Sequence, residues 1–300
     1  MIELEEKATA TNPLRIGLMG FGKTGRAVAT VLLKDPGLRL EWVIRKSHKL
    51  EHRSVPEFLG IESPEPGLIY TAEEFSAAQL FDHHPVDAII DFSSEEGLSF
   101  YGDEAAQRGI TIVTAISSYE SKKIHELERL SKKTRVLWSP NITVGINFMI
   151  LAARTLRLIT PETDVEIVEE HFKDKREISG TAKKIAQSLE VEEDNIKSIR
   201  AGGIIGTHEI LFGFPFQTVR LKHESISREA FGNGARFAVR ELIKRDPGMY
   251  TMEEMLGPYF LESNEKFQLN SEVIERPIGV EAIALMKRAY RKMLSALRAE

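Results

Sequence analysis

The 300-residue chain contains no cysteine. This absence excludes disulfides, thiolate nucleophiles and zinc sites with cysteine ligands, and it fits a reducing compartment. Long apolar runs are also missing, because the longest, Ile146–Ile159, carries two arginines and is shorter than the roughly 18 residues of a membrane span. The first residues lack the basic and apolar regions of a signal peptide. We therefore expect a soluble cytoplasmic protein that does not bind membranes, with residues 1–12 as a flexible tail.

An excess of positive charge is absent as well. Lys and Arg number 40 against 45 Asp and Glu, which gives a formal net charge of −5. Nucleic-acid-binding domains usually present a basic surface, so we expect no nucleic-acid partner. We predict no metal site in the chain.

Short β-branched runs alternate with helical patterns in the first half of the chain. The pattern predicts strands at Arg15–Met19, Leu38–Ile44, Val86–Asp91, Thr111–Thr114 and Arg135–Trp138, and helices at Gly25–Leu33, Gly97–Arg108 and Ser121–Lys132. Strands and helices in alternation indicate βαβ units and a parallel sheet. We expect an α/β fold with an N-terminal Rossmann-type parallel sheet.

The pattern changes after Pro140. It predicts a helix at Ile146–Ile159, strands at Val165–Glu170, Ser198–Ala201, Glu209–Phe212 and Thr218–His223, and helices that begin near Thr181 and Phe231. These elements indicate a second α+β domain with a mixed, mostly open sheet. One more amphipathic helix is expected at Val280–Arg298, packing its apolar stripe on the core; a helix that binds a membrane surface or a partner is the alternative.

A glycine-rich turn follows the first predicted strand and opens the first predicted helix. Its candidate cofactor-binding residues are Gly20, Phe21, Gly22, Lys23, Thr24 and Gly25. In a G-x-G-x-x-G turn the glycines allow a tight bend, a close approach of the backbone to a pyrophosphate and close packing of helix on strand. The helix N-terminus adds partial positive charge. The turn predicts dinucleotide binding.

The end of the second predicted strand bears on the choice of dinucleotide. NAD enzymes usually carry an acidic residue there, which holds the ribose 2′-hydroxyl. Here the strand leads into Arg45, Lys46 and Ser47, which suit a 2′-phosphate. We therefore predict NADPH, with NADH as the alternative; a basic loop that is only solvated is the other interpretation.

The segment after Val165–Glu170 combines groups that suit protonation of a small anion. His171 and Lys175 lie four residues apart, and Ser179, Gly180 and Thr181 form a turn that opens a helix. An imidazole can donate a proton near neutral pH, and a helix N-terminus can bind a carboxylate.

Other histidines and acids near this segment receive structural interpretations. A surface-loop histidine is the alternative for His171. We interpret the neighbouring Glu169–Glu170 pair as solvated, and His208 and His223 as structural hydrogen-bonding residues.

At this point the chain resembles the 4-hydroxy-tetrahydrodipicolinate reductase (dihydrodipicolinate reductase) family, from about Leu14 to Phe260. Six segments carry the resemblance in the family's order: the glycine turn, Val86–Ser93, Pro140–Asn147, His171–Ala182, Arg200–His208 and Arg228–Ala235. The resemblance implies reduction of a cyclic imine dicarboxylate with NAD(P)H and a homotetramer. It also implies that the chain returns to the first domain, so that residues 13–146 plus about 235–300 form the dinucleotide-binding domain and 147–234 the substrate-binding and oligomerisation domain.

The resemblance also implies roles for residues. His171 matches the proton donor, Lys175 a lysine that meets a substrate carboxylate, and Gly180 with Thr181 the carboxylate cradle. Asn141 lies on the loop at the nicotinamide side, and Thr114 and Ala115 stand where the family has a segment that packs by the nicotinamide.

The sequence departs from the family at Phe172, where a second histidine is usual, and at Glu177–Ile178, where the loop is shorter. Two other functions therefore stay open. One is a related imine reductase or amino-acid dehydrogenase, and the other is a dinucleotide-binding regulatory protein without turnover.

Overall fold

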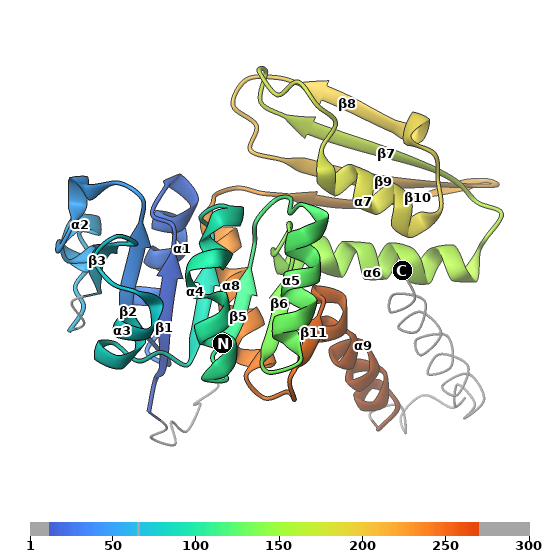
Figure 1. The fold of residues 1–300 in the computed structure, drawn as a ribbon. Helices are drawn as coiled ribbons and strands as arrows, with labels where there is room; N and C mark the ends of the chain where they lie inside the picture. The colour runs from blue at the N-terminus through green and yellow to red at the C-terminus, as the bar shows by residue number, and fades with distance from the viewer. Residues whose placement is uncertain (1–11, 65–66, 270–300) are drawn as a thin grey trace.

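The computed structural model describes residues 12–64 and 67–269. In these residues two β-sheets lie in separate parts of the molecule (Figure 1). The first sheet has seven parallel strands in the order β11-β6-β5-β4-β1-β2-β3. Its strands are β1 Leu14–Met19, β2 Leu38–Arg45, β3 Leu68–Thr71, β4 Ala88–Asp91, β5 Thr111–Thr114, β6 Arg135–Trp138 and β11 Gly248–Tyr250.

Helices cover both faces of this sheet, which is why its central strands β4 and β5 are buried at every position. One face packs against α1 Lys23–Leu33, α2 Val55–Leu59, α8 Glu229–Leu242 and the start of α9 Met252–Leu269. The other face packs against α3 Ala77–His83, α4 Glu95–Gln107 and α5 Ser121–Ser131. Two short 3₁₀ helices, η1 His48–Leu50 and η2 Glu193–Asn195, complete the connections.

The second sheet has four strands in the order β10-β9-β7-β8. They are β7 Asp164–His171, β8 Ile196–Arg200, β9 Thr207–Phe214 and β10 Gln217–Glu224, and β7 pairs with β8 in parallel and with β9 antiparallel. Helices α6 Val144–Ile159 and α7 Gly180–Leu189 pack on one face (Figure 1). Among the described residues no helix covers the other face, so the predicted α/β fold with a mixed, open second sheet is confirmed.

The chain returns to the first sheet through α8, and two glycines allow this helix to pack closely. A Cβ on Gly232 would lie 2.8 Å from Val31 in α1, and a Cβ on Gly234 would lie 2.0 Å from the carbonyl oxygen of Ile142. The backbone of α8 therefore packs against α1 and against the segment that leaves β6.

The predicted strands and helices of both domains are present within the described ranges, with small shifts at their ends. Strands β3 and β11, of four and three residues, were not predicted. The predicted helix at Val280–Arg298 lies outside the described residues. Within the described ranges no helix has the length and apolar character needed to cross a membrane.

A buried acid at the end of β4 makes stability depend on pH. The Asp91 side chain accepts hydrogen bonds from Ser93 N at 2.8 Å and Tyr101 Oη at 2.9 Å. Burial raises the pKa of Asp91 from 3.8 to about 6, although the bonds from Ser93 and Tyr101 act in the other direction. The folded protein therefore loses stability as pH rises from about 3.8 to about 6.

We predict that Asp91→Asn removes this pH dependence, because the amide is uncharged throughout. Ionisation of Asp91 lowers the free energy of unfolding of the wild-type protein by about 3 kcal/mol between pH 3.8 and pH values above 6. Urea unfolding of both proteins at several pH values between 4 and 8 gives the comparison. If the difference in unfolding free energy between the two proteins is the same at every pH, the carboxylate does not titrate in this window.

Candidate active site

The glycine turn lies between β1 and α1 at the carboxyl edge of the first sheet. Gly20 has a φ of +95°, and a Cβ on Gly25 would lie 2.1 Å from the Gly20 carbonyl oxygen, so helix and turn pack backbone to backbone. Gly22 is the N-cap of α1, and a Cβ there would meet no described atom beyond its chain neighbours within 4 Å. The turn leaves open space before a helix N-terminus, where a phosphate can bind.

The other residues of the turn point in different directions. Phe21 is buried, with its ring centroid 5.7 Å from that of Phe58, and the Arg26 guanidinium lies over both rings. The Phe21 side chain therefore anchors the turn in the core and offers a ligand only its backbone. Lys23 and Thr24, in the first turn of α1, line two separate hollows.

The larger of these hollows, about 510 Å³, lies at the carboxyl ends of the central strands. Thr24 and Ala115 line it together with Ser93, Pro140 and other residues of the loops after β4, β5 and β6. The sheet order reverses between β1 and β4, and open α/β sheets bind ligands at this switch point.

Thr114 occupies a different place from Ala115. It is fully buried, and its Oγ1 lies 2.7 Å from Tyr119 Oη, so its hydroxyl supports the core beneath the hollow. The Thr114 side chain therefore lies in the core and is not exposed to a cofactor.

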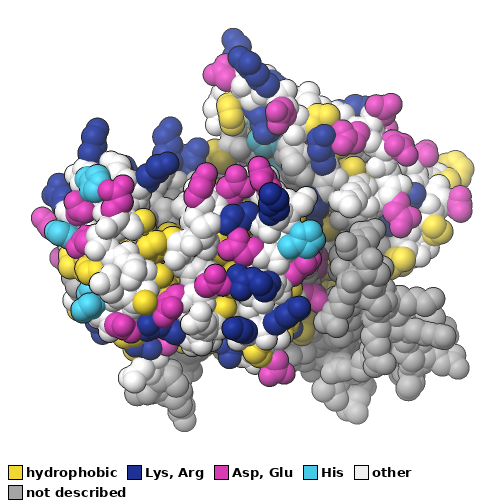
Figure 2. Space-filling model, in the orientation of Figure 1, with side chains coloured by type: hydrophobic (Ala, Val, Ile, Leu, Met, Phe, Trp, Pro, Cys, Tyr) yellow, Lys and Arg dark blue, Asp and Glu magenta, His cyan; other side chains and the backbone are white. Residues whose placement is uncertain are grey.

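The residues predicted to bind a 2′-phosphate lie at the carboxyl end of β2, the strand next to β1. They are Arg45, Lys46 and Ser47. The Gly20 amide donates to the carbonyl oxygen of Ile44 at 2.8 Å, which joins the glycine turn to the end of β2. Lys46 is exposed and acts on the Glu96 carboxyl at the start of α4, whose pKa is lowered first by its bond from Ser94 and further by Lys46. Figure 2 shows Lys and Arg side chains projecting from this upper edge, over α1 and α2.

In the second domain, four side chains from two neighbouring strands meet near the end of β7. Glu169 and His171 are two residues apart in β7 and therefore share a face. The parallel strand β8 pairs Ser198 with Glu169 and Arg200 with His171. This register brings together a carboxylate, an imidazole, a hydroxyl and a guanidinium.

The Glu169 carboxylate is the centre of this group. It is fully buried and accepts hydrogen bonds from Arg200 Nη2 at 2.6 Å, Arg200 Nη1 at 2.9 Å and Ser198 Oγ at 2.5 Å. His171 Nδ1 lies 2.5 Å from its Oε2. Burial alone would raise the pKa of Glu169, but the bonds from Arg200, Ser198 and His171 outweigh burial and lower it to about 2.

Two interpretations made from the sequence are therefore wrong. Glu169 is not solvated, because the strand turns it inward. His171 is not a surface-loop histidine, since it is 9% exposed and ends a strand. The sequence held one signal for this network, the spacing of two residues in both Glu169–His171 and Ser198–Arg200, but it did not give the pairing of the two strands.

The outer ring nitrogen of His171 lies on the side of Gly206. A Cβ on Gly206 would lie 3.1 Å from His171 Nε2. No described residue forms a hydrogen bond with Nε2, so this nitrogen is the one that can exchange a proton with a ligand.

His208 lies beside His171, with ring centroids 5.3 Å apart. Its Nε2 is 2.9 Å from Ser179 Oγ, so its interpretation as a structural hydrogen-bonding residue is confirmed. Burial, with smaller contributions from His171 and Lys175 among others, lowers the pKa of His208 to about 3, and the ring is neutral. The same interpretation of His223 is not supported, because its buried Nδ1 has no hydrogen-bond partner among the described residues.

Lys175 lies in the turn between β7 and α7, and its side chain is half-buried. Its amide donates to the Phe172 carbonyl oxygen, and its own carbonyl accepts from Arg200 Nε at 2.9 Å. The charge of Lys175 makes a small contribution to the lowered pKa of His208.

The Ser179–Thr181 turn opens α7 as predicted, with Ser179 as the N-cap. Gly180 is exposed, and Thr181 Oγ1 accepts from Asn141 Nδ2 at 2.8 Å. Asn141 comes from the loop after β6, at the edge that carries the glycine turn. This hydrogen bond therefore connects the second domain to the edge of the first sheet that carries the glycine turn.

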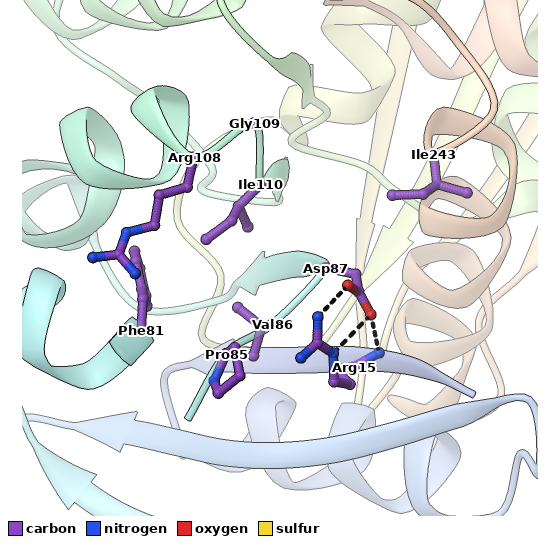
Figure 3. Close-up of a pocket in the computed structure, with 9 residues that line it drawn as sticks. All are labelled: Arg15, Phe81, Pro85, Val86, Asp87, Arg108, Gly109, Ile110 and Ile243. Atoms are coloured by element: carbon purple, nitrogen blue, oxygen red, sulfur yellow. Dashed lines mark hydrogen bonds and ion pairs between the residues drawn. The ribbon is translucent and has the colours of Figure 1, made fainter. Parts of the chain in front are cut away.

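A separate cavity of about 310 Å³ lies at the opposite, amino edge of the first sheet (Figure 3). Its charged groups are already paired, since Arg15 bonds Asp87 at 2.8 Å and Arg108 bonds Asp82 and Glu104. None of the predicted site residues lines it, and we assign no ligand to it.

One group in the described ranges has the residue types of a metal site: Glu51, His52 and Glu74, near the ends of β2 and β3. His52 Nε2 lies 2.8 Å from Glu74 Oε1, and Glu51 accepts from Thr71 Oγ1 at 3.0 Å. His52 and Glu74 are therefore paired with each other, and Glu51 is paired with Thr71.

A glycine turn at the switch point of a parallel sheet, next to a second domain with a histidine held by a buried carboxylate, defines a two-domain dinucleotide-dependent oxidoreductase. Two family profiles match consecutive parts of the chain. "Dihydrodipicolinate reductase, N-terminus" matches residues 14–142, and "Dihydrodipicolinate reductase, C-terminus" matches residues 143–256. The chain belongs to the dihydrodipicolinate reductase family, as its sequence motifs predicted.

Curated relatives agree with this assignment. The 4-hydroxy-tetrahydrodipicolinate reductase of Syntrophus aciditrophicus is 28% identical over 265 residues, which cover 79% of this chain and 96% of the relative. That of Caldanaerobacter subterraneus is 32% identical over 192 residues, which cover 57% of this chain and 76% of the relative.

A solved structure, dipicolinate-bound dihydrodipicolinate reductase from Paenisporosarcina sp. TG-14, shares the fold. Its TM-score is 0.67 at 20% sequence identity, with coverage of 80% of this chain and 97% of that one.

We predict that two alanine substitutions separate the packing role of the turn from its ligand role. Gly25→Ala places a methyl group against the Gly20 carbonyl and should lower the unfolding free energy by about 1–3 kcal/mol. Gly22→Ala should change it by less than about 0.5 kcal/mol but weaken dinucleotide binding, because the methyl group enters the open space. Urea unfolding and calorimetric titration measure the two effects; equal destabilisation by both substitutions would contradict the packing argument.

Proposed function

We propose that the chain reduces 4-hydroxy-tetrahydrodipicolinate to tetrahydrodipicolinate with NAD(P)H, in diaminopimelate and lysine biosynthesis. One observation carries the proposal. The Asn141–Thr181 hydrogen bond joins the edge that holds the glycine turn to the turn that follows His171 and Lys175. A binding site for a hydride donor and a set of groups for a small anion are therefore connected within one chain of this reductase family.

The first domain binds and orients the dinucleotide. The open space beside Gly22 and the N-terminus of α1 fit a pyrophosphate, and the hollow lined by Thr24 and Ala115 leads from there over the switch point. Asn141 lies at the border of this hollow, next to Pro140. When bound, the nicotinamide supplies the hydride.

The second domain binds the dicarboxylate and supplies the proton. The exposed amide of Gly180, the Thr181 hydroxyl and the positive end of α7 form a carboxylate cradle. Lys175 neutralises the second carboxylate and makes the imine a better hydride acceptor. His171 donates a proton from Nε2 to the atom that becomes negatively charged once the hydride has been added.

We also propose NADPH as the preferred cofactor. Arg45 ends β2 next to the glycine turn and the exposed Lys46 follows it, and Ser47 adds a hydroxyl that can donate. These groups suit a 2′-phosphate better than an unmodified ribose.

A homotetramer divided as the family resemblance implies, with residues 147–234 as the associating domain, belongs to the same proposal. Support comes from the uncovered face of the four-stranded sheet and from exposed apolar residues in or near it, with Ile199 45% exposed and Ile226 87% exposed. Apolar surface of this kind usually marks an interface.

A related cyclic imine is the second candidate substrate. Phe172 follows His171 directly and is 45% exposed, so an exposed apolar ring takes the place of the family's usual second histidine. A panel of cyclic imines with and without two carboxylates separates the two candidates by kcat/KM.

We predict that His171→Ala lowers turnover by about 10²–10⁴-fold with unchanged NADPH affinity, since the side chain acts on the proton and not on the dinucleotide. Lys175→Ala should raise KM for the dicarboxylate as well as lower turnover. The assay follows NADPH absorbance with substrate generated by a synthase. Lys173→Ala, which removes the same charge two residues away from an exposed side chain, is the matched control. Wild-type turnover in His171→Ala would remove this residue from the mechanism.

A further prediction concerns the cofactor. Arg45→Ala should weaken NADPH binding by about tenfold or more, and NADH binding much less, because only NADPH presents a 2′-phosphate. Calorimetric titration with both dinucleotides measures this. Arg39→Ala, at the amino end of the same strand, is the control. Equal losses for NADPH and NADH would refute the role of Arg45.

A further inference from the structure

The pair of Glu169 and Arg200 determines which nitrogen of His171 faces the site. Glu169 is ionised at neutral pH, because its pKa is about 2, and a carboxylate can only accept hydrogen bonds. His171 Nδ1 lies 2.5 Å from Glu169 Oε2. A bare Nδ1 at this distance would place two lone pairs against each other, so Nδ1 carries a proton. Nε2, on the side of Gly206, is left to exchange the other proton.

The neighbouring His208 cannot replace His171 as the residue that exchanges a proton with a ligand. His208 is neutral, and its Nε2 is engaged with Ser179 Oγ at 2.9 Å. Its ring stands edge-on to that of His171, at an interplanar angle of 75°. His208 therefore has a structural role beside the site. Of the two histidines, only His171 is hydrogen-bonded to a buried carboxylate.

Arg200 connects the same carboxylate to the loop that carries Lys175. Two of its nitrogens bond Glu169, while its Nε donates to the Lys175 carbonyl at 2.9 Å and its Nη2 to the Glu177 carbonyl at 2.9 Å. This planar fork is a geometry that lysine cannot reproduce. Arg200 therefore stabilises both the His171 imidazole, through Glu169, and the backbone of the loop that carries Lys175.

We propose that Glu169, held by Arg200, is a positioning residue that fixes the proton of His171 on Nδ1 and stabilises the imidazolium from which Nε2 gives its proton to the substrate. The inference rests on the proposed function. In the step, the substrate first loses its hydroxyl group as water, which leaves a C=C bond conjugated with the C=N bond. The hydride from NAD(P)H then forms a C–H bond at this C=C bond, the Nε2–H bond breaks, and its electron pair stays on Nε2. The proton goes to the substrate atom that took up the negative charge. His171 stays bound to Glu169 through Nδ1–H, and water returns the proton to Nε2.

The first test needs no substitution. The full-length wild-type protein is labelled with ¹⁵N-histidine, and the His171 signals are assigned by their loss in His171→Ala. Above the pH at which the ring becomes neutral, we expect the Nδ1–H form with an unprotonated Nε2. A predominant Nε2–H form would overturn the proposal whether or not the protein reduces its proposed substrate. If the Nδ1–H form is found and His171→Ala keeps full turnover, the proposed function of His171 fails while the role of Glu169 in fixing the tautomer stands.

The second test uses Glu169→Gln, which keeps the shape but removes the charge and can pair with either tautomer. We expect both tautomers in the spectrum, a fall in kcat of about 10²-fold and a KM for NADPH close to that of the wild type. The alkaline limb of the pH–rate profile should move to lower pH, because the imidazolium loses its anion. Wild-type kcat, pH profile and tautomer together would overturn the proposal.

Two further variants complete the design. Glu170→Gln makes the same chemical change one residue away, on the opposite face of β7, and should leave tautomer, kcat and pH profile unchanged. Arg200→Lys should lower kcat and also raise KM for the dicarboxylate, since it releases the Lys175 loop. NADPH titration shows that each variant is folded, and the wild-type spectrum still decides the proposal if one of them is not.

Discussion

The candidate site depends on one interaction, the burial of an ionised carboxylate at Glu169. A charge removed from water is tolerated only when hydrogen bonds replace its hydration. Here the donors come from β7, from β8 and from the N-cap of α7, whose amide at Ser179 lies 3.4 Å from the carboxylate. The three elements are therefore held in one arrangement by a single group. Its stabilising effect is complete above pH 4.5 and is lost as pH falls toward 2.

Much of the fold could be predicted from the sequence because its signals are local. The G-x-G-x-x-G turn follows a short apolar run and precedes a helical pattern, and the steric contact between Gly25 and Gly20 gives the physical reason for two of the glycines. The central strands are rich in β-branched apolar residues and buried at every position, as expected for strands covered on both faces. Strand β11 escaped prediction because three residues show no period.

The site was only partly predictable for a different reason. His171, Lys175 and the Ser179–Thr181 turn are close in sequence, so their grouping could be seen directly. Glu169 was misassigned because two consecutive glutamates in a strand look the same, although one faces inward and one faces outward. The alternation with Val165 and Ile167 along β7 and the register against Ser198 and Arg200, some 30 residues away, separate them. Thr114 shows the converse: the family resemblance placed it in a segment that packs by the nicotinamide, but its hydroxyl lies within hydrogen-bond distance of Tyr119 inside the core.

The late return of the chain to the first sheet has a consequence for biosynthesis. Strand β11 pairs with β6, and Arg135 donates to the carbonyl of Arg245, 110 residues further on. During translation, β6 therefore emerges with an unpaired edge and stays so until the entire intervening domain has been made. An exposed edge of a nascent sheet is prone to join other chains. The folding protein is thus most vulnerable to aggregation during synthesis of the second domain, and this is the interval in which a chaperone would protect it most.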